Sequence, residues 1–337
     1  MDINIYKYEI CTVLKTFPEK KKSDYKPTKN FKDTWEKLDD FTEYFEQNLV
    51  LKLLCLKDKR VGFSCYPNIR IYNKNFQKID IIIPIKSSYI FQYLKDGNLI
   101  ACKGNNILII FSINKNKYNI IQNFDMKKNF IPKKILELSN NQIISIDVSP
   151  YIEFYSKTDG LYSSLKILYL KYDRVEDAKD IIEIPGNKLV VFSYKFHSLL
   201  VFDINSNECL LKKPISYSIY NIMSDLIDNR YIFAGSDDGI VVYDINNDFS
   251  QILYQDIKTP YYLNKINAYE YFFVEENLIQ LVKFKDKKFE KIKTINFRLN
   301  NNCSYDSKVY KIDDFKFIIK IGEKKINSQY FIIFNKV

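Results

Sequence analysis

The same pattern of apolar and polar positions recurs seven times between residues 49 and 337. Each repeat has a short apolar strand, a tight polar turn, a second apolar strand, and a third strand that ends in an aromatic residue. The first repeat runs from Leu53 through a turn at Lys57–Lys59 to Tyr72. A repeat of roughly 40 to 50 residues in a β-rich chain is typical of a β-propeller. We therefore predict that residues 49–337 form one propeller.

The polar turns and the terminal aromatic residues keep a regular distance. Asp96–Gly97 lies between two apolar runs and strongly favours a hairpin, because both residues tolerate a positive φ. The distance from turn to aromatic is 14 to 16 residues in the first six repeats, and Glu323–Ser328 is expected to be an extended loop in the seventh. The other turns are expected at Asn140–Asn141, Gly186–Asn187, Asp228–Asn229, Tyr269–Glu270 and Asp313–Asp314, and the terminal aromatic residues are Tyr72, Phe111, Tyr155, Phe202, Tyr243, Phe284 and Phe334.

The seventh repeat lacks an apolar stretch for a fourth strand, because the sequence ends at Val337. The first six repeats have such a stretch after the aromatic residue. A three-stranded blade would expose the edge of its third strand, which closed architectures avoid. Ile3–Tyr8 alternates apolar and polar residues with the period of a strand. We therefore predict an all-β, seven-bladed propeller of four-stranded blades, closed by a strand within residues 1–12.

Residues 13–48 lie outside the repeat. The stretch from Lys15 to Lys32 contains seven lysines and two prolines, so we expect a basic linker. The stretch from about residue 31 to 48 predicts an amphipathic helix, because large apolar residues recur every three or four positions. Two interpretations are open: the helix packs on the rim of the propeller, or Trp35, Phe41 and Phe45 dock a partner protein.

Two repeats resemble a known family. Phe233–Gly239 followed by Ile240–Asp244 resembles two strands of a Trp-Asp (WD40-like) repeat, with Tyr243 and Asp244 at the position of the signature dipeptide. Phe202 and Asp203 form a second such pair. The resemblance implies a propeller that is a divergent member of the family, because the sequence has no Gly-His pair and only one histidine.

The net charge of +10 suggests nucleic acid or an anionic membrane as a partner. Only five of the 51 basic residues are arginine, the residue that reads bases best, so coding bias is the preferred explanation. One basic patch, Lys283–Lys293, interleaves Lys283, Lys287 and Lys291 with two phenylalanines. It is either a solvated hairpin or a contact for RNA or acidic lipid such as a phosphoinositide.

The residues that usually carry catalysis do not assemble in the sequence. His197 is the only histidine, and the six cysteines are scattered without a Cys-x-x-Cys pair. No glycine-rich phosphate loop is present, and the paired acids fall in turns or on the surface of the predicted helix. We therefore predict no metal, no cofactor and no enzymatic activity. No apolar run reaches the roughly 18 residues of a membrane span and no signal peptide is recognisable, so we expect a cytoplasmic protein.

A non-catalytic scaffold for other proteins, within a larger assembly, is the function that this sequence favours. Two alternatives remain open at this point. One is a propeller enzyme with a metal ion at the mouth of the channel. The other is a basic module that binds RNA or phosphoinositide.

Overall fold

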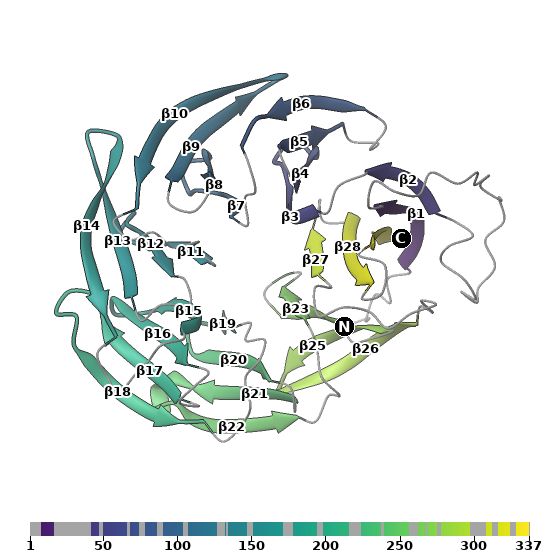
Figure 1. Cartoon of the computed structure of the whole chain (residues 1–337). Coiled ribbons are helices and arrows are strands. Elements are labelled where there is room, and N and C mark those ends of the chain that lie inside the picture. The colour runs from purple at the N-terminus through teal and green to yellow at the C-terminus, as the bar shows by residue number, and fades with distance from the viewer. Residues whose placement is uncertain are drawn as a thin grey trace.

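The chain folds into an all-β, propeller-like architecture whose sheets follow one another around a common centre (Figure 1). The computed structural model describes residues 8–16, 42–46, 50–65, 68–73, 78–85, 90–103, 107–126, 132, 134–146, 151–170, 178–193, 198–215, 224–236, 239–255, 262–265, 267, 269–274, 278–296, 308–311, 316–323 and 328–336. These residues form seven sheets, six of four strands and one of five. None of the described residues forms a helix long and apolar enough to cross a bilayer.

Six sheets are antiparallel meanders of consecutive strands, and their bounds follow in chain order. The first is β3 (Val50–Cys55), β4 (Val61–Cys65), β5 (Ile69–Tyr72) and β6 (Ile79–Ile83); the second is β7 (Phe91–Tyr93), β8 (Leu99–Lys103), β9 (Ile107–Asn114) and β10 (Lys117–Asp125). The third is β11 (Lys134–Glu137), β12 (Ile143–Ile146), β13 (Tyr151–Thr158) and β14 (Leu161–Tyr169); the fourth is β15 (Ala178–Ile184), β16 (Lys188–Ser193), β17 (Ser198–Asp203) and β18 (Cys209–Pro214). The fifth is β19 (Ser224–Ile227), β20 (Tyr231–Ser236), β21 (Gly239–Asp244) and β22 (Ser250–Gln255), with a 3-10 turn η2 (Ile245–Asn247); the sixth is β23 (Tyr262–Lys265), β24 (Glu270–Val274), β25 (Leu278–Lys285) and β26 (Lys288–Asn296). In each of these six sheets the first strand lies nearest the centre and the fourth strand lies at the rim (Figure 1).

The seventh sheet joins the two ends of the chain in the order β2-β1-β29-β28-β27. Its C-terminal strands are β27 (Lys308–Lys311), β28 (Lys316–Glu323) and β29 (Ser328–Lys336). Strand β1 (Tyr8–Thr16) pairs antiparallel with β29, so an N-terminal strand does complete this sheet. It lies further along the chain than Ile3–Tyr8 and continues through Thr16, four residues into the predicted linker. Residues 1–7 lie outside the described residues.

The predicted helix over residues 31–48 is wrong where the structure describes it. Thr42–Glu46 forms strand β2, which pairs in parallel with β1. The spacing of Phe41 and Phe45 fits a helix, but Thr42, Tyr44 and Phe45 are strand-forming residues. The free edge of β1 offers backbone hydrogen-bond partners to this segment, and tertiary pairing overrides a local helical pattern. The rest of the predicted helix lies outside the described residues.

The first five predicted hairpin turns are confirmed by their backbone conformation. A residue with positive φ occurs in each of them, namely Lys59, Gly97, Asn141, Asn187 and Asp228. The two aspartates of the Trp-Asp resemblance shape a different turn, between the third and fourth strands. Asp203 Oδ1 accepts hydrogen bonds from the Asn205 and Ser206 amides, both at 2.8 Å, and Asp244 Oδ1 accepts one from the Asn246 amide at 3.1 Å. Glu323 and Ser328, expected in a loop, are cross-strand partners at the ends of β28 and β29.

The terminal aromatic residues mark a β-bulge in the outer strand. Opposite Tyr72, Phe111, Tyr155, Phe202, Tyr243 and Phe334, the outer strand gains one extra residue. In the sixth sheet the bulge lies opposite Val282, which pairs with Tyr271 as Phe111 pairs with Leu99. The structural equivalent of the terminal aromatic residue is therefore Val282, and the prediction of Phe284 was two residues too late. Phe284 is buried all the same, and its ring lies 5.0 Å from that of Phe289 between centroids.

The apolar core lies between adjacent sheets. One cluster joins the first and second sheets, with Ile71, Phe91 and Phe111 fully or almost fully buried. Similar clusters join each following pair up to the fifth and sixth sheets, where Phe233 packs edge-to-face on Tyr271 at 4.9 Å between ring centroids. The second to fifth sheets therefore each bury both faces against a neighbour, which couples the first six sheets in series.

Candidate interaction surfaces

The aromatic residues predicted to dock a partner are only partly placed by the structure. Trp35 and Phe41 lie outside the described residues. Phe45 lies in β2, at the outer edge of the seventh sheet, and its side chain is not described. This segment is therefore an added strand of the ring and not a helical arm in its described part.

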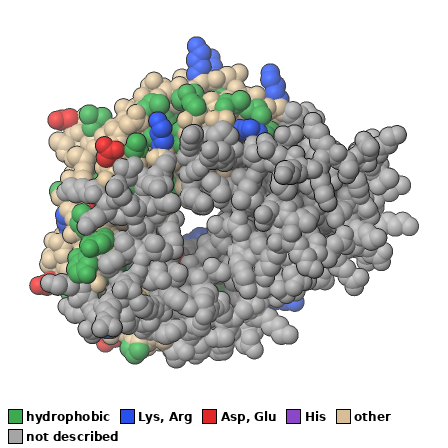
Figure 2. Space-filling model, in the orientation of Figure 1, with side chains coloured by type: hydrophobic (Ala, Val, Ile, Leu, Met, Phe, Trp, Pro, Cys, Tyr) green, Lys and Arg blue, Asp and Glu red, His purple; other side chains and the backbone are tan. Residues whose placement is uncertain are grey.

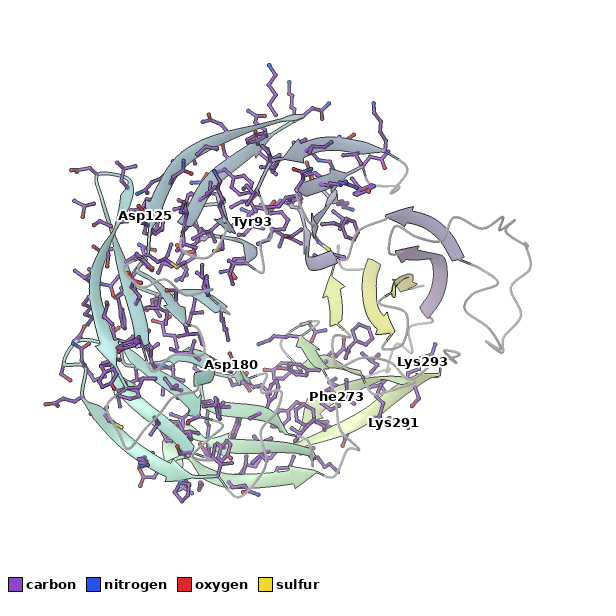
Figure 3. The ribbon with its side chains drawn as sticks, viewed as in Figure 1. Tyr93, Asp125, Asp180, Phe273, Lys291 and Lys293 are labelled. Carbon is purple, nitrogen blue, oxygen red and sulfur yellow. The ribbon has the colours of Figure 1, made fainter. Side chains whose placement is uncertain are left out.

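The predicted basic patch does not present its lysines on one face. Lys283 on β25 lies opposite Glu290 on β26, whereas Lys291 lies opposite Val282. Neighbouring residues of a strand point to opposite faces and cross-strand partners share a face, so Lys283 and Lys291 point away from each other. Lys287 lies in the intervening turn with φ 64°. All three lysines are exposed, and Lys291 and Lys293 lie on the rim strand β26 (Figure 3).

Two carboxylates lie close to these lysines. Lys288 Nζ lies 3.5 Å from Glu290 Oε1. The Arg230 guanidinium binds Asp244 through both Nε and Nη2, at 3.0 and 2.7 Å, and is the main reason that the pKa of the Asp244 carboxyl is below its ordinary value, with Lys287 adding a smaller effect. The side of the ring that carries Lys287 therefore contains acids beside bases, which weakens it as a site for a polyanion.

At the inner strands, acidic side chains hold the turn of the preceding sheet. The Lys95 amide donates to Glu137 Oε2. The next sheet repeats this contact, since the Ser139 amide donates to Glu183 Oε2 at 2.8 Å and the Ser139 hydroxyl donates to Oε1 at 2.6 Å. In the sheet before, the Lys57 amide donates to Tyr93 Oη at 3.0 Å. The contact therefore recurs between the first four sheets.

Between the fourth and fifth sheets, Pro185 and Leu226 occupy the two positions of this contact, but their side chains and backbone cannot form the hydrogen bond. Pro185 occupies the turn position of Lys95 and Ser139, but proline has no amide N–H to donate. Leu226, which pairs with Ile232 as Glu183 pairs with Leu189, has no side-chain acceptor. The donor and the acceptor are thus replaced together, and this hydrogen bond is absent between the fourth and fifth sheets.

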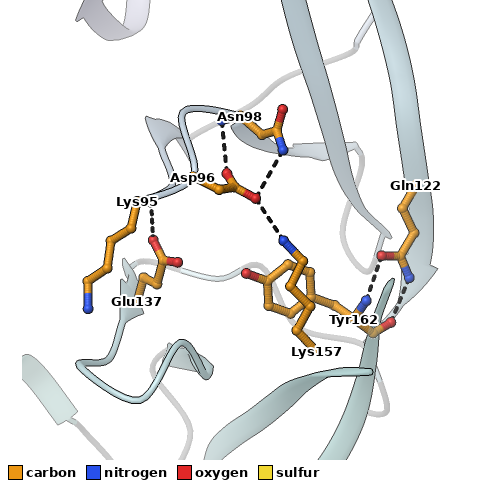
Figure 4. A network of polar contacts seen from close by, with 7 residues as sticks. All are labelled: Lys95, Asp96, Asn98, Gln122, Glu137, Lys157 and Tyr162. Carbon is orange, nitrogen blue, oxygen red and sulfur yellow. Dashed lines mark hydrogen bonds and ion pairs between the residues drawn. The ribbon is translucent and has the colours of Figure 1, made fainter. Parts of the chain in front are cut away.

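A polar network links the second and third sheets (Figure 4). Asp96 Oδ2 accepts a hydrogen bond from Lys157 Nζ at 2.8 Å, and Asp96 Oδ1 accepts one from the Asn98 amide at 2.9 Å. Burial opposes ionisation of Asp96, but these bonds outweigh it and lower the pKa of its carboxyl. Lys157 Nζ also lies 5.3 Å from the Tyr162 ring centroid, and burial raises the pKa of Tyr162 to about 12. The network is arranged to hold two sheets together.

Side chains of the outer strands also form hydrogen bonds with backbone groups of the next sheet in chain order. Gln122 Nε2 donates to the Tyr162 carbonyl at 2.6 Å, and the Tyr162 amide donates to Gln122 Oε1 at 2.8 Å. Lys166 Nζ donates to the Ile204 carbonyl at 2.6 Å, and Lys213 Nζ donates to the Phe249 carbonyl at 2.6 Å. The ammonium groups of Lys166 and Lys213 are therefore hydrogen-bonded to backbone carbonyls, and the sequence alone does not indicate these contacts.

One group of buried polar side chains lies between the second and third sheets. Glu153, Ser145 and Tyr155 have no exposed surface, and Glu153 Oε1 accepts a hydrogen bond from Ser164 Oγ at 3.2 Å. Burial raises the pKa of Tyr155 above its ordinary value and that of the nearby Cys102 thiol to about 12. A solute cannot reach these groups without separating the sheets, so the cluster is part of the core.

Metal-ligating side chains do not gather in the part of the chain that the structure describes: no group of three or more histidine, cysteine, aspartate or glutamate residues is placed to hold an ion there. His197 lies outside the described residues.

The rim carries a repeated set of aliphatic side chains that sequence reasoning missed. The extra residue of the outer-strand bulge is aliphatic in five consecutive sheets. Four of these side chains are exposed, and Ile252 is half-buried. The five residues are Ile121, Leu165, Leu210, Ile252 and Ile292. Two adjacent aliphatic residues in an outer strand, as in Ile120–Ile121 and Leu210–Leu211, are the signal that could have revealed the bulge, because they break the alternation of a regular strand. Apolar side chains are visible at the rim in Figure 2.

Comparisons with known proteins identify the fold and not an activity. No family model matches the chain, and no curated protein matches its sequence. Among solved structures 1303 chains match, so the shape is widespread and singles out no function. One of them, described as "Structure of U3-55K", has a TM-score of 0.62 and 11% sequence identity, and the match covers 85% of this chain and 95% of that one. The fold is a WD40-like β-propeller.

Proposed function

We propose that this protein is a non-catalytic scaffold that binds other proteins as a subunit of a larger assembly in the cytoplasm. We further propose that the seven sheets are the blades of a closed seven-bladed ring, with β1 completing the last blade. The observation that carries the proposal is the set of exposed aliphatic side chains on the rim, at Ile121, Leu165, Leu210 and Ile292. Large apolar side chains exposed on successive elements are typical of protein-binding surfaces.

The contacts between adjacent sheets support a rigid scaffold. Inner turns, outer-strand lysines and the apolar clusters all tie one sheet to the next. A surface held in this way loses little conformational freedom when a partner binds, so more of the contact energy appears as affinity. A stable interface buries roughly 1,200 Å² or more in total.

The basic-module alternative gains no support from the lysines that suggested it. Lys283 and Lys291 point to opposite faces, and Glu290 lies between Lys283 and Lys288. We therefore expect Lys283→Glu, Lys287→Glu and Lys291→Glu to leave any affinity for RNA or phosphoinositide vesicles within about twofold of the unaltered chain, measured at low salt. A steep loss of affinity would restore that alternative.

Cross-linking mass spectrometry on native cells tests the scaffold directly. We expect cross-links from rim residues to other proteins and sedimentation of the endogenous protein in a complex heavier than the 40.2 kDa chain. Recovery of the protein only as a monomer would contradict the proposal. Elemental analysis of the purified protein is the companion measurement, because stoichiometric calcium or zinc would favour a metalloenzyme instead.

A further inference from the structure

The structure itself contains one case in which an outer edge accepts a fifth strand. β2 pairs in parallel with Val13–Thr16 of β1, directly after the bulge at Cys11. The other outer strands have the same bulge at the equivalent position. Each of them therefore offers a short regular segment after the bulge, with the geometry that β2 uses on β1. No described strand occupies those six edges.

Strand β14 is the outer edge best suited to receive a fifth strand. It is nine residues long, and its exposed apolar side chains are Leu161, Leu165 and Tyr169, at 52%, 47% and 46% of their full exposure. Tyr169 is further ordered by the ring of Tyr151, 5.0 Å away between centroids. A long apolar edge strand is a template for pairing with another chain.

Charge distinguishes β14 from most of the other outer strands. Its only charged residue is Lys166, whose ammonium group is already bound to the Ile204 carbonyl and to Asn207 Oδ1. Charged side chains on an edge disfavour strand addition. The remaining outer strands of the first six sheets carry such side chains, except for β22, which is three residues shorter and has no exposed large apolar residue among its described side chains. Those charged residues are Asp80, Lys117, Asp125, Lys212, Lys213, Lys288, Glu290, Lys291 and Lys293.

We propose that the post-bulge edge of β14, Lys166–Tyr169, binds an extended, apolar segment of an acidic partner protein as a fifth strand. This inference rests on the proposed scaffold function and names its binding mode. Backbone hydrogen bonds supply the affinity, and Leu165 and Tyr169 contact alternate side chains of the added strand. An acidic partner is favoured over a second copy of this chain, because two copies with a net charge of +10 each repel one another.

The test uses the full chain and a blocked peptide, Glu-Glu-Thr-Val-Thr-Val-Thr-Glu-Glu, as the probe. We expect saturable binding, with slower hydrogen exchange of the backbone amides of residues 166–169. A matched peptide with proline at the central position lacks an N–H and disrupts strand pairing, so it should bind at least about tenfold more weakly. Equal binding of the two peptides would overturn the proposal, since charge alone would then explain the affinity.

Matched variants locate the site. Leu165→Asp and Tyr169→Asp should each weaken peptide binding by about tenfold or more, and the uncharged Leu165→Ser should weaken it by a smaller factor. Ile82→Asp is the control, because Ile82 lies on the outer strand β6 outside the rim set, is 53% exposed and undergoes the same change of charge. If Ile82→Asp weakens binding as much as Leu165→Asp, or if the protected amides lie on another strand, the inference is wrong. A concentration-dependent dimer that Leu165→Asp abolishes would also overturn it, by assigning the edge to a second copy.

Failure of this inference is distinguishable from failure of the scaffold function. A native complex whose cross-links avoid β14, together with unprotected amides at residues 166–169, leaves the scaffold standing and removes this binding mode. A protein that is monomeric in cells removes the scaffold function itself.

Discussion

Gly62 gives the sharpest test of how closely the first two sheets pack. It lies in β4, and a Cβ atom added to it would lie 2.5 Å from Cε1 and 2.8 Å from Cζ of Phe91, and 2.9 Å from Cδ1 of Ile71. Phe91 belongs to β7 of the next sheet and is fully buried. The φ of Gly62 is not in the left-handed region, so space and not backbone conformation requires glycine here.

Gly62→Ala should therefore destabilise the protein by forcing the Phe91 ring away from β4. Adding a methyl group to a close-packed interior costs about 1 to 3 kcal/mol. The upper half of that range is expected, because the ring is enclosed by Leu99, Ala101 and Phe111 and has little room to move. For a chain of this size the corresponding decrease in Tm is about 2 to 6 °C.

A double-mutant cycle with Phe91→Leu separates this clash from other effects. Leucine removes the two ring atoms nearest the added methyl group, so Gly62→Ala should cost much less in that background, with a coupling free energy of about 1 kcal/mol or more. Thermal unfolding followed by circular dichroism gives the four Tm values. An unchanged Tm for Gly62→Ala, or strictly additive effects in the double variant, would show that the sheets are not packed as closely as described.

Other predictions follow from contacts between sheets and from the seventh sheet. Glu183→Ala should cost about 0.5 to 1 kcal/mol, because it removes the hydrogen bonds to the exposed Ser139, which water can partly replace, whereas the exposed Glu208→Ala should be nearly neutral in the same thermal assay. Because folding lowers the pKa of Asp96, its carboxylate stabilises the protein above the ordinary value of 3.8, and the advantage over Asp96→Asn should disappear in melts as pH falls through the lowered pKa. Asp244→Asn should cost about 1 kcal/mol, since its partner Arg230 is 44% exposed, and high salt should reduce the difference. Deleting residues 1–16 removes β1 and exposes the edge of β29, so we expect a lower Tm and increased aggregation by light scattering.

The repeat could be predicted from the sequence because each sheet is built from local hairpins. The turns at Gly97, Asn141 and Asn187 need residues that tolerate a positive φ, and such residues are recognisable without any tertiary information. The buried third strands are short apolar runs, as expected for strands covered on both faces. Local chemistry was therefore sufficient for the first five sheets.

The misassigned segments are those whose structure depends on distant partners. Thr42–Glu46 is a strand because the edge of β1 is available, and the spacing of its aromatic residues contains no information about that edge. The terminal aromatic residue of the sixth repeat was placed at Phe284 because the sequence does not show that Val282 pairs with Tyr271. The strand register is likewise not visible in the sequence: Lys283–Lys293 does form a hairpin, but alternation on β25 and β26 separates Lys283 from Lys291.

The rim bulges connect the stability of the ring with its proposed use. A bulge at the outer strand interrupts edge pairing and so protects each sheet from uncontrolled association. The same bulge turns an aliphatic side chain outward, as at Leu165 and Leu210, and leaves a regular segment beyond it. On β1 that segment already carries β2, which shows that the protection is partial and directional. On most other strands charged residues complete the protection, and on β14 they do not. Selective binding at one edge thus requires no special motif, only the omission of charges from a strand that is otherwise built like its neighbours.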